Sequence, residues 1–354
     1  MNDRMTYLVT GGAGFIGSHL VDGLLTAGRR VVVLDNLSTG RAENLATARK
    51  HSAFRFVHGS VLDATLVDAL TRECDAVVHL AAAVGVKLII EQPLTSFITN
   101  IRGTETVIDA AHRHGCGVLL ASTSEIYGKN SHGALGEMAD RILGSPSVAR
   151  WSYSTAKAVD EVLANLYHRE RGLKTTIVRF FNVVGPRQSP AYGMVVPRFA
   201  RQAVAGSPLT VHGAGRQRRC FLHVADAVAA LLLLLDNPAA DGETFNIGGE
   251  EEISVGELAE RMIAQAGSAS TVRQLSYDEA YGPGFEDMER RLPDTTKLRE
   301  LTGWRPQHSL AEVMAAAIAE AREQQDGTEP ADAPGVPGRR RPAAPSAPVA
   351  EDSR

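Results

Sequence analysis

The sequence has 354 residues, 44% of them hydrophobic, so the chain is long enough to bury a large core. Its formal net charge of −4 gives no general attraction to nucleic acid or to anionic membranes. The three cysteines, Cys74, Cys116 and Cys220, are odd in number and lack metal-ligand spacing, which argues against a disulfide framework and favours a reducing compartment. We expect a globular, cytoplasmic protein whose partners are small molecules.

Neither a membrane nor a nucleic acid is an expected partner. The leucine-rich run at 229–235 is too short to span a bilayer, and no cleavable leader pattern stands at the N-terminus. No basic face studded with aromatic residues is evident. The histidines have no ligand spacing beyond the HRH at 112–114, so we expect no metal site.

Short apolar runs predict a series of buried strands, each followed by a segment long enough for a helix. The predicted strands lie at 6–11, 30–35, 54–60, 76–82, 117–123 and 174–182. Continuous apolar strands that alternate with helices are typical of a parallel sheet covered on both faces. The N-terminal half is therefore predicted to be a doubly wound α/β domain.

The pattern changes beyond about residue 183. Loop-like segments and helices at 223–236, 254–266 and 309–323 indicate a smaller α+β lobe. From about residue 324 the sequence is rich in Pro, Ala and charge without an apolar period, which predicts a disordered tail. The expected division is therefore 1–182, 183–323 and 324–354.

The stretch TGGAGFIG joins the first predicted strand to its helix. Gly11 permits a tight turn, Gly14 lets the backbone approach a pyrophosphate, and Gly17 allows close packing of helix on strand. Asp35 ends the second strand, where its carboxylate can bind the ribose hydroxyls of a dinucleotide and repel the extra phosphate of NADP. Asn36 follows it in place of an arginine. NAD is therefore expected rather than NADP, although a glycine pattern alone also fits a simple tight turn.

A second cluster carries acid–base chemistry. Tyr153 and Lys157 are four residues apart in a helical segment, so they share one face. The lysine ammonium and a nicotinamide cation would lower the pKa of the tyrosine toward neutrality and make it a base. Thr123, Ser124 and Glu125 end the fifth strand and are expected to face the same crevice. The alternatives are an exposed helix face for the tyrosine–lysine pair and a helix cap or turn for the other three.

The motifs TGGAGFIG, LDNL, HLAA, STSEIYG, YSTAK and RFFNVVGPR occur in the order found in extended short-chain dehydrogenase/reductases that act on nucleotide sugars. The resemblance covers about residues 5–320. It implies a Rossmann-type sheet that holds NAD tightly, a C-terminal lobe for the nucleotide sugar, and a homodimer formed through a helix bundle. The implied NAD contacts are Gly11, Gly14, Phe15, Ile16, Gly17, Asp35, Asn36, Ser60, Val61, Leu80, Ala81, Ala82, Tyr153 and Lys157.

One cofactor position departs from the family pattern. The family commonly has an acidic residue at position 60, where it contacts the adenine amino group, and this chain has Ser60. A serine hydroxyl would accept that hydrogen bond less strongly, and Val61 would offer its backbone.

The resemblance also implies substrate contacts. Asn182 and Arg219 would bind the pyrophosphate of the substrate, and Thr210 and His212 would flank its base. A surface ion pair is the alternative for Arg219, although Arg219 is one of three arginines in the stretch GRQRRCF, which favours an anion site.

The reaction implied by the family begins with oxidation at C4. The tyrosinate removes the 4-hydroxyl proton while hydride passes from C4 to NAD. A 4,6-dehydratase has aspartate where this chain has Ser124, so dehydration is disfavoured. If C6 is a carboxylate, the 4-ketone makes it a β-keto acid, which loses carbon dioxide.

Two segments resemble UDP-glucuronate decarboxylases. These are STSEIYG and YGPGFEDMERRLPD, and the second places Arg291 at the sugar carboxylate or at the diphosphate. Arg187 is a second candidate for the carboxylate, and a link between domains is the alternative for either arginine. The lead prediction is decarboxylation of UDP-glucuronate to UDP-xylose or UDP-4-keto-xylose.

Two other functions stay open. The segment AAAVGVKLIIEQPL at 81–94 is more similar to 4-epimerases, so a UDP-glucuronate or UDP-glucose 4-epimerase is the alternative. A catalytically silent NAD-binding regulator is the third hypothesis; such proteins usually lose the base, which is present here as Tyr153.

Overall fold

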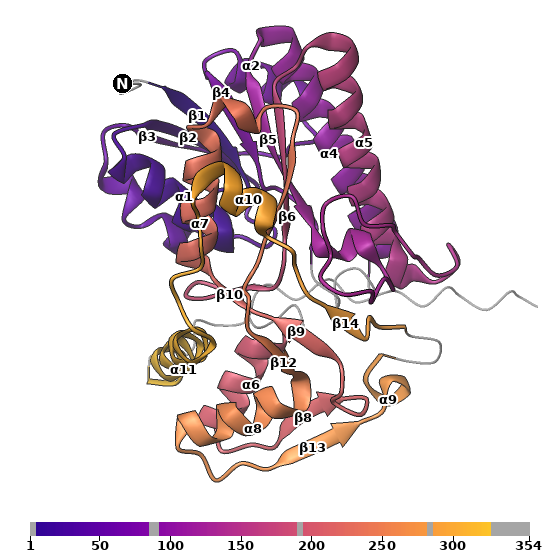
Figure 1. Ribbon diagram of the computed structural model, residues 1–354. Helices are drawn as coiled ribbons and strands as arrows, with labels where there is room; N and C mark the ends of the chain where they lie inside the picture. The colour runs from indigo at the N-terminus through magenta and orange to yellow at the C-terminus, as the bar shows by residue number, and fades with distance from the viewer. Residues whose placement is uncertain (1–4, 85–91, 190–193, 282–285, 327–354) are drawn as a thin grey trace, which may run out of the picture.

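The computed structural model describes residues 5–84, 92–189, 194–281 and 286–326. Its main layer is a seven-stranded sheet in the order β11-β6-β5-β4-β1-β2-β3, in which every neighbouring pair is parallel (Figure 1). The strands are β1 (Thr6–Thr10), β2 (Arg30–Asp35), β3 (Phe54–His58), β4 (Ala76–His79), β5 (Gly117–Thr123), β6 (Thr175–Phe180) and β11 (Thr244–Ile247). The predicted Rossmann-type α/β fold is confirmed; all six predicted strands are present, two with the predicted bounds and four shorter than predicted.

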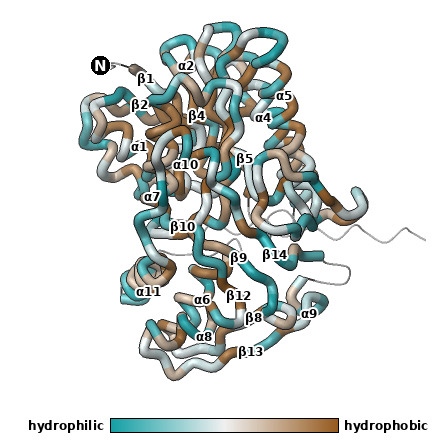
Figure 2. The backbone as a smooth tube through the Cα atoms, in the orientation of Figure 1, coloured by the Kyte–Doolittle hydropathy of each residue, from teal (hydrophilic) through white to brown (hydrophobic). Residues whose placement is uncertain are grey.

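Helices cover both faces of this sheet because its strands are apolar on both sides. One face packs on α1 (Phe15–Thr26), α7 (Val224–Leu235) and α10 (Thr296–Thr302). The other packs on α2 (Ala64–Thr71), α4 (Pro93–His114) and α5 (Ser152–Arg171). Successive residues of β1 divide between the two cores, with Val9 in the first and Leu8 in the second. Figure 2 shows the central strands as a hydrophobic band between these layers.

The chain crosses between the two lobes more often than the predicted division at residue 182 implies. β11 comes from beyond that point and pairs with β6, with Phe245 opposite Val178. The helices α7 and α10 also belong to the core of the large sheet. A strand of four residues between loops gives a weak sequence signal, which is why the seventh strand was not predicted.

The smaller lobe has a core of its own, built around three helices. These are α6 (Val195–Val204), α8 (Val255–Ala266) and α11 (Leu310–Asp326). Its short strands form a three-stranded sheet of β12 (Glu252–Ser254), β9 (Arg218–Cys220) and β14 (Arg290–Arg291), and two pairs, β13 (Val272–Leu275) with β8 (Leu209–His212) and β10 (Leu222–His223) with β7 (Val183–Val184). A five-residue helix, α9 (Tyr277–Tyr281), follows β13.

Several smaller expectations can be compared with the structure. The three cysteines are free and buried, as expected without a disulfide framework. The predicted tail began too early, because α11 continues through residues 324–326, and the rest of the tail lies outside the described residues. Residues 85–91, which belong to the 81–94 segment that resembles 4-epimerases, also lie outside the described residues. No helix in the described part of the chain is long and apolar enough to cross a membrane.

The fold sets the place of the site. Because the strands of the large sheet are parallel, their carboxyl ends meet at one edge, where β1, β2, β4 and β5 each continue into a predicted site segment. The small lobe lies against that edge in Figure 1. The predicted cofactor and substrate residues therefore approach the same region from two lobes.

The glycine turn supplies a stability prediction. A Cβ on Gly17 would lie 2.2 Å from the Gly11 carbonyl oxygen and 2.9 Å from Gly12 Cα, which are backbone atoms that cannot rotate away. We expect Gly17→Ala to lower the free energy of unfolding by about 1–3 kcal/mol, measured by urea denaturation. The control is Gly117→Ala, where the nearest atom would be Lys174 Cβ at 3.6 Å. Equal stability of the two variants would contradict the close packing of α1 on the turn.

Candidate functional site

The glycine-rich turn forms a backbone cradle between β1 and α1. Gly11 has φ +71°, in the left-handed region, and a Cβ there would lie 2.7 Å from the Ala81 nitrogen. α1 starts directly after Gly14, and no side chain caps its first N–H groups. An uncapped helix N-terminus beside a turn that excludes side chains fits a pyrophosphate.

Asp35 is fixed beside this turn. Its Oδ2 accepts from Ala13 N at 2.9 Å and its Oδ1 from Leu37 N at 2.8 Å. Burial raises the pKa of Asp35, and these two backbone donors oppose the shift. Each carboxylate oxygen can accept a further hydrogen bond, as recognition of a ribose diol requires. The turn and Asp35 together fit the dinucleotide that the sequence predicts.

The remaining predicted cofactor residues line the same edge. Phe15 and Ile16 open α1, Asn36 follows Asp35, and Ser60 and Val61 follow β3. Leu80, Ala81 and Ala82 follow β4, and Ala81 N donates to Thr10 Oγ1 at 3.3 Å.

A buried polar chain that the sequence did not suggest ties these strand ends together. His79 Nδ1 lies 2.7 Å from Thr10 Oγ1, and His79 Nε2 lies 3.2 Å from Thr104 Oγ1 on α4. Burial lowers the pKa of His79 to about 3, so its ring is neutral at physiological pH. The neutral ring fixes the end of β4 against the residue that precedes the glycine turn.

Tyr153 and Lys157 lie in the first turns of α5, and both are buried. The Tyr153 phenol and the Thr123 hydroxyl form a hydrogen bond, so the predicted tyrosine and threonine do come together. The backbone N–H of Glu125 also donates to Thr123 Oγ1 at 3.1 Å, which is the cap that the alternative interpretation expected. The hydroxyl therefore serves both the local turn and the tyrosine.

The predicted lowering of the Tyr153 pKa does not come from the chain's own groups. Burial raises this pKa, and the negative charges of Glu125 and Asp160 raise it further, against the hydrogen bond from Thr123. The Lys157 ammonium donates to Asp160 Oδ2 at 3.1 Å, so its charge is largely balanced within α5. Asp160 was not predicted, although its i,i+3 spacing from Lys157 was a readable signal.

Glu125 lies between two arginines. Arg291 Nη1 donates to Glu125 Oε1 at 2.7 Å, and Arg150 Nη1 donates to Glu125 Oε2. Burial alone would raise the pKa of Glu125, but the two guanidinium groups outweigh it and hold the pKa at about 2. Glu125 is therefore a carboxylate at neutral pH, so it acts there by charge and by hydrogen-bond acceptance.

Arg150 is the main residue that the sequence analysis missed. It lies in a short 3₁₀-helix, Ala149–Trp151, directly before α5, and only 4% of its surface is exposed. A single arginine in a loop carries no sequence signal of burial. Ser124, which was predicted, is also buried, next to Glu125 in the 3₁₀-helix Ser124–Tyr127.

The predicted pyrophosphate ligands meet the same network. Arg291 Nη2 donates to Asn182 Oδ1 at 2.9 Å, and the pairing of β14 with β9 sets Arg291 opposite Arg219. Arg219 is 6% exposed and donates to Met288 O at 2.6 Å and to Asp287 at 3.3 Å. Burial and the neighbouring Arg291 lower the pKa of Arg219 to about 10. Arg219 is thus a buried cation, and its ion pair with Asp287 is not on the surface.

The predicted base contacts lie farther along the small lobe. Thr210 and His212 are in β8, and His212 Nδ1 lies 2.9 Å from the Tyr281 hydroxyl. Burial lowers the pKa of His212 to about 4. The Tyr277 and Tyr281 rings stack at 6.5 Å between centroids, a pair that the sequence analysis did not single out.

Arg187 is not part of this network. Its Nη2 lies 2.8 Å from Asp22 Oδ2 on α1, and its φ of +67° is left-handed. This contact corresponds to the alternative interpretation, a link between the small lobe and the large domain.

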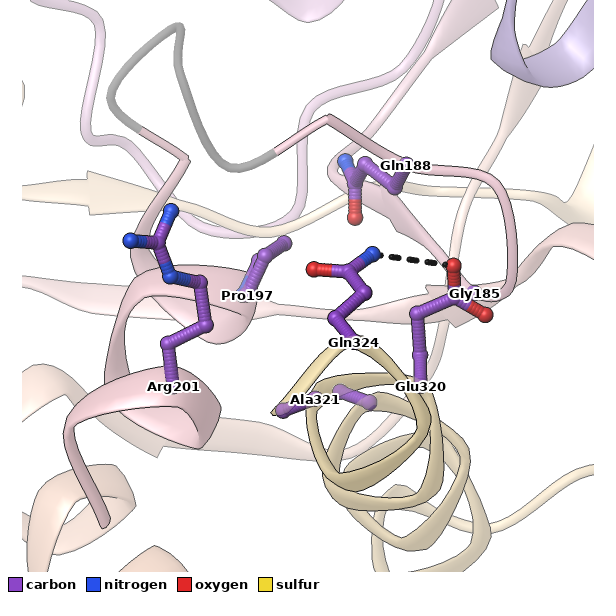
Figure 3. Close-up of a pocket in the computed structure, with 8 residues that line it drawn as sticks. Gly185, Gln188, Pro197, Arg201, Glu320, Ala321 and Gln324 are labelled. Carbon is purple, nitrogen blue, oxygen red and sulfur yellow. Dashed lines mark hydrogen bonds between the residues drawn. The ribbon is translucent and has the colours of Figure 1, made fainter. Parts of the chain in front are cut away.

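The described residues line two pockets, one between α6 and α11 and one beside Asp287. The pocket in Figure 3 lies between α6 and α11, where Pro197 and Arg201 face Glu320 and Gln324, and its lining includes Gly185 and Gln188 on either side of the Arg187 segment. A separate polar cavity is lined by Lys129, Ser131, Glu286, Asp287 and Glu289. Of these, Asp287 is the carboxylate that pairs with Arg219. Within the described ranges, no group of three or more His, Cys, Asp or Glu side chains is placed to hold a metal.

Comparisons with known proteins show which proteins the chain is similar to. Residues 7–248 match the model of the NAD dependent epimerase/dehydratase family. A UDP-N-acetyl-alpha-D-glucosaminuronate decarboxylase from Bacillus cytotoxicus is 39% identical over 300 residues, which cover 84% of this chain and 92% of the relative. Solved structures are similar to the chain as well.

Two examples are structures that contain NAD. A UDP-glucuronic acid 4-epimerase from Bacillus cereus, in complex with UDP-glucuronic acid and NAD, has a TM-score of 0.80 at 29% identity and covers 90% of this chain and 99% of its own. A dTDP-glucose 4,6-dehydratase from Streptomyces venezuelae, with NAD bound, has a TM-score of 0.80 at 32% identity and covers 91% of this chain and 98% of its own.

The Glu125 network yields a prediction for stability against pH. In Glu125→Gln the two buried guanidinium groups lose their shared charge partner, so we expect the free energy of unfolding at pH 7 to fall by about 3–5 kcal/mol. Because the folded pKa of about 2 lies below the ordinary 4.5, this contribution is complete above pH 4.5 and is lost as pH falls toward 2. The difference in the free energy of unfolding between Glu125→Gln and wild type should therefore be smaller at pH 3 than at pH 7, measured by urea denaturation.

The control for this prediction is Glu243→Gln. Glu243 pairs with Lys297 at 2.6 Å, but its side chain is half-exposed, so we expect a loss of at most about 1 kcal/mol. A difference between Glu125→Gln and wild type that is equal at pH 7 and pH 3 would show that the carboxylate charge is not what the two arginines stabilise.

Proposed function

The chain belongs to the NAD dependent epimerase/dehydratase family, and we propose that it binds NAD and oxidises a UDP-linked uronic acid at C4, with decarboxylation as the outcome. UDP-glucuronate is the lead substrate, and the similarity to a UDP-N-acetylglucosaminuronate decarboxylase makes the 2-acetamido uronate the second to test. The products for UDP-glucuronate would be carbon dioxide and UDP-xylose or UDP-4-keto-xylose.

The observation that carries the proposal is an excess of buried positive charge beside Tyr153. At that end of the network two guanidinium groups, Arg150 and Arg291, share the single carboxylate of Glu125. Arg219 has Asp287 as its own partner. Since an unbalanced charge is costly in a buried site, an anionic substituent on the sugar would be stabilised there. A uronate supplies that substituent, and a neutral hexose does not.

The chain's residues suit the steps of such a reaction. NAD, when bound at the glycine turn, supplies the acceptor and donor of hydride. Tyr153 would take the proton of the sugar 4-hydroxyl, with the Thr123 hydroxyl bonded to its phenol. With a ketone at C4, the C6 carboxylate belongs to a β-keto acid, and its loss as carbon dioxide leaves an enolate on the 4-oxygen. The Tyr153 and Thr123 hydroxyls would donate to that oxygen.

The alternatives differ in the fate of the keto sugar. The similarity to a UDP-glucuronic acid 4-epimerase supports C4 inversion as the second candidate, using the same Tyr153. Dehydration has less support because a serine, Ser124, stands where the dehydratase pattern has an aspartate acid. A catalytically silent regulator has the least support, because Tyr153, Lys157 and Thr123 are all present.

We also propose that two copies pair through α4 and α5. The α5 residues Val159, Val162 and Leu166 are exposed by 36–57% and recur at i, i+3 and i+7, so they form one apolar stripe. Leu94 at the start of α4 is exposed as well. A second copy would cover this surface, in keeping with the homodimer that the sequence resemblance implies.

The dimer proposal predicts a change in mass. Val162→Glu would bury a charge in the interface, so we expect its dimer dissociation constant to rise about tenfold or more, measured by analytical ultracentrifugation. Val272→Glu is the control, because Val272 is exposed on β13 in the small lobe. A wild-type monomer, or an unchanged dimer in Val162→Glu, would contradict the proposal.

The reaction itself is tested with product analysis. Purified protein is incubated with UDP-glucuronate, with and without NAD, and followed by mass spectrometry and proton NMR. We expect loss of carbon dioxide and a UDP-pentose or UDP-4-keto-pentose. Unchanged mass with an inverted C4 proton signal would replace decarboxylation by 4-epimerisation.

Tyr153→Phe separates catalysis from cofactor binding. We expect this variant to lose C4 oxidation, with a fall in rate of at least about 100-fold, while NAD remains bound in amounts equal to wild type. Normal turnover in Tyr153→Phe would remove the tyrosine mechanism. No reaction of the wild-type protein with either uronate would remove the decarboxylase proposal.

A further inference from the structure

Arg150 is buried where the two lobes meet. It is 4% exposed, and its guanidinium lies 5.6 Å from the ring centre of Trp151. Besides Glu125, the charged or titratable groups that act on it are Asp287 and Tyr281, both from the small lobe. Because α5 begins two residues later, Arg150 is held on the rigid element that also carries Tyr153.

The donors of this arginine are incompletely used. Its Nη1 bonds Glu125, while its Nε is buried and has no hydrogen-bond partner among the described residues. The same holds for Arg291, whose Nη1 and Nη2 are bonded and whose buried Nε is not. Buried donors normally find acceptors, so two orphaned guanidinium N–H groups on one network indicate an acceptor that binds there.

The charge balance identifies the kind of acceptor. Glu125 neutralises only one of the two guanidinium groups that it contacts, and Glu125 is itself ionised at neutral pH. Arg187, the other arginine that the sequence suggested for a carboxylate, is engaged with Asp22 on α1. A second carboxylate would complete the charge balance at Arg150 and Arg291 and accept from their planar forks.

We propose that Arg150 is a specificity-determining residue that, together with Arg291, binds the C6 carboxylate of the nucleotide-sugar substrate. Glu125 holds the two guanidinium groups in place, so its role is to position them. This inference rests on the proposed uronate function and names the residue that selects the uronate over the neutral hexose.

The test is a comparison of two ligands in two proteins. Binding of UDP-glucuronate and UDP-glucose to full-length protein is measured by isothermal titration calorimetry with NAD present, in a Tyr153→Phe background so that neither ligand turns over. Adding Arg150→Met should weaken the binding of UDP-glucuronate about tenfold or more, because a hydrogen bond to a charged group is lost. The binding of UDP-glucose should weaken by less than about threefold.

Two further variants guard the interpretation. Arg150→Lys keeps the positive charge but loses the planar fork of donors, so its affinity for UDP-glucuronate should lie between those of the parent protein and Arg150→Met. Arg218→Met is the matched control, because Arg218 is a partly exposed arginine of β9 paired with Glu252, and it should leave the ratio of the two affinities unchanged. Thermal unfolding of each variant checks that it folds.

The outcomes separate this inference from the function on which it rests. If the parent protein prefers UDP-glucuronate and Arg150→Met weakens both ligands equally, the role of Arg150 in specificity is overturned while the uronate function stands. If the parent protein binds UDP-glucose as tightly as UDP-glucuronate, the uronate function fails and this inference fails with it.

Discussion

The site depends on one buried carboxylate shared by two buried guanidinium groups. Glu125 belongs to the large domain, Arg150 to the segment before the tyrosine helix, and Arg291 to the small lobe. Removing Glu125 would leave two guanidinium groups without their shared charge partner in a buried environment, and the Glu125–Arg291 contact joins the large domain to the small lobe. The same contact explains why Glu125 stays ionised and why the network beside Tyr153 carries an excess of positive charge.

The fold delivers these residues through the connection rule of parallel sheets. Strand ends on one edge bring the glycine turn, Asp35, the Thr123–Glu125 run and Asn182 together, although they are far apart in sequence. The chain then leaves the large domain, returns to add β11, and leaves again to place β14 beside β9. That path sets Arg219 and Arg291 side by side over the site. The two-lobed arrangement and the site are therefore consequences of one topology.

Local motifs were predictable from the sequence, and long-range pairs were not. Gly11, Asp35 and Tyr153 stand in patterns of a few residues whose backbone demands can be read directly. Arg150 and β11 gain their roles from contacts with distant segments, which carry no local signal. The pKa of Tyr153 was expected to fall because of Lys157, yet burial and two carboxylates raise it in the chain alone. The Lys157–Asp160 pair has a local i,i+3 spacing, whereas the approach of Glu125 to Tyr153 depends on the fold.

The most direct test of the account is a crystal structure of Tyr153→Phe with NAD and UDP-glucuronate. The account predicts the sugar carboxylate within hydrogen-bond distance of the Arg150 and Arg291 guanidinium groups, and the 4-hydroxyl beside the ring of residue 153 and the Thr123 hydroxyl. A sugar carboxylate that faces solvent, or that contacts neither arginine, would contradict the claim that the buried charge of this network selects an acidic sugar.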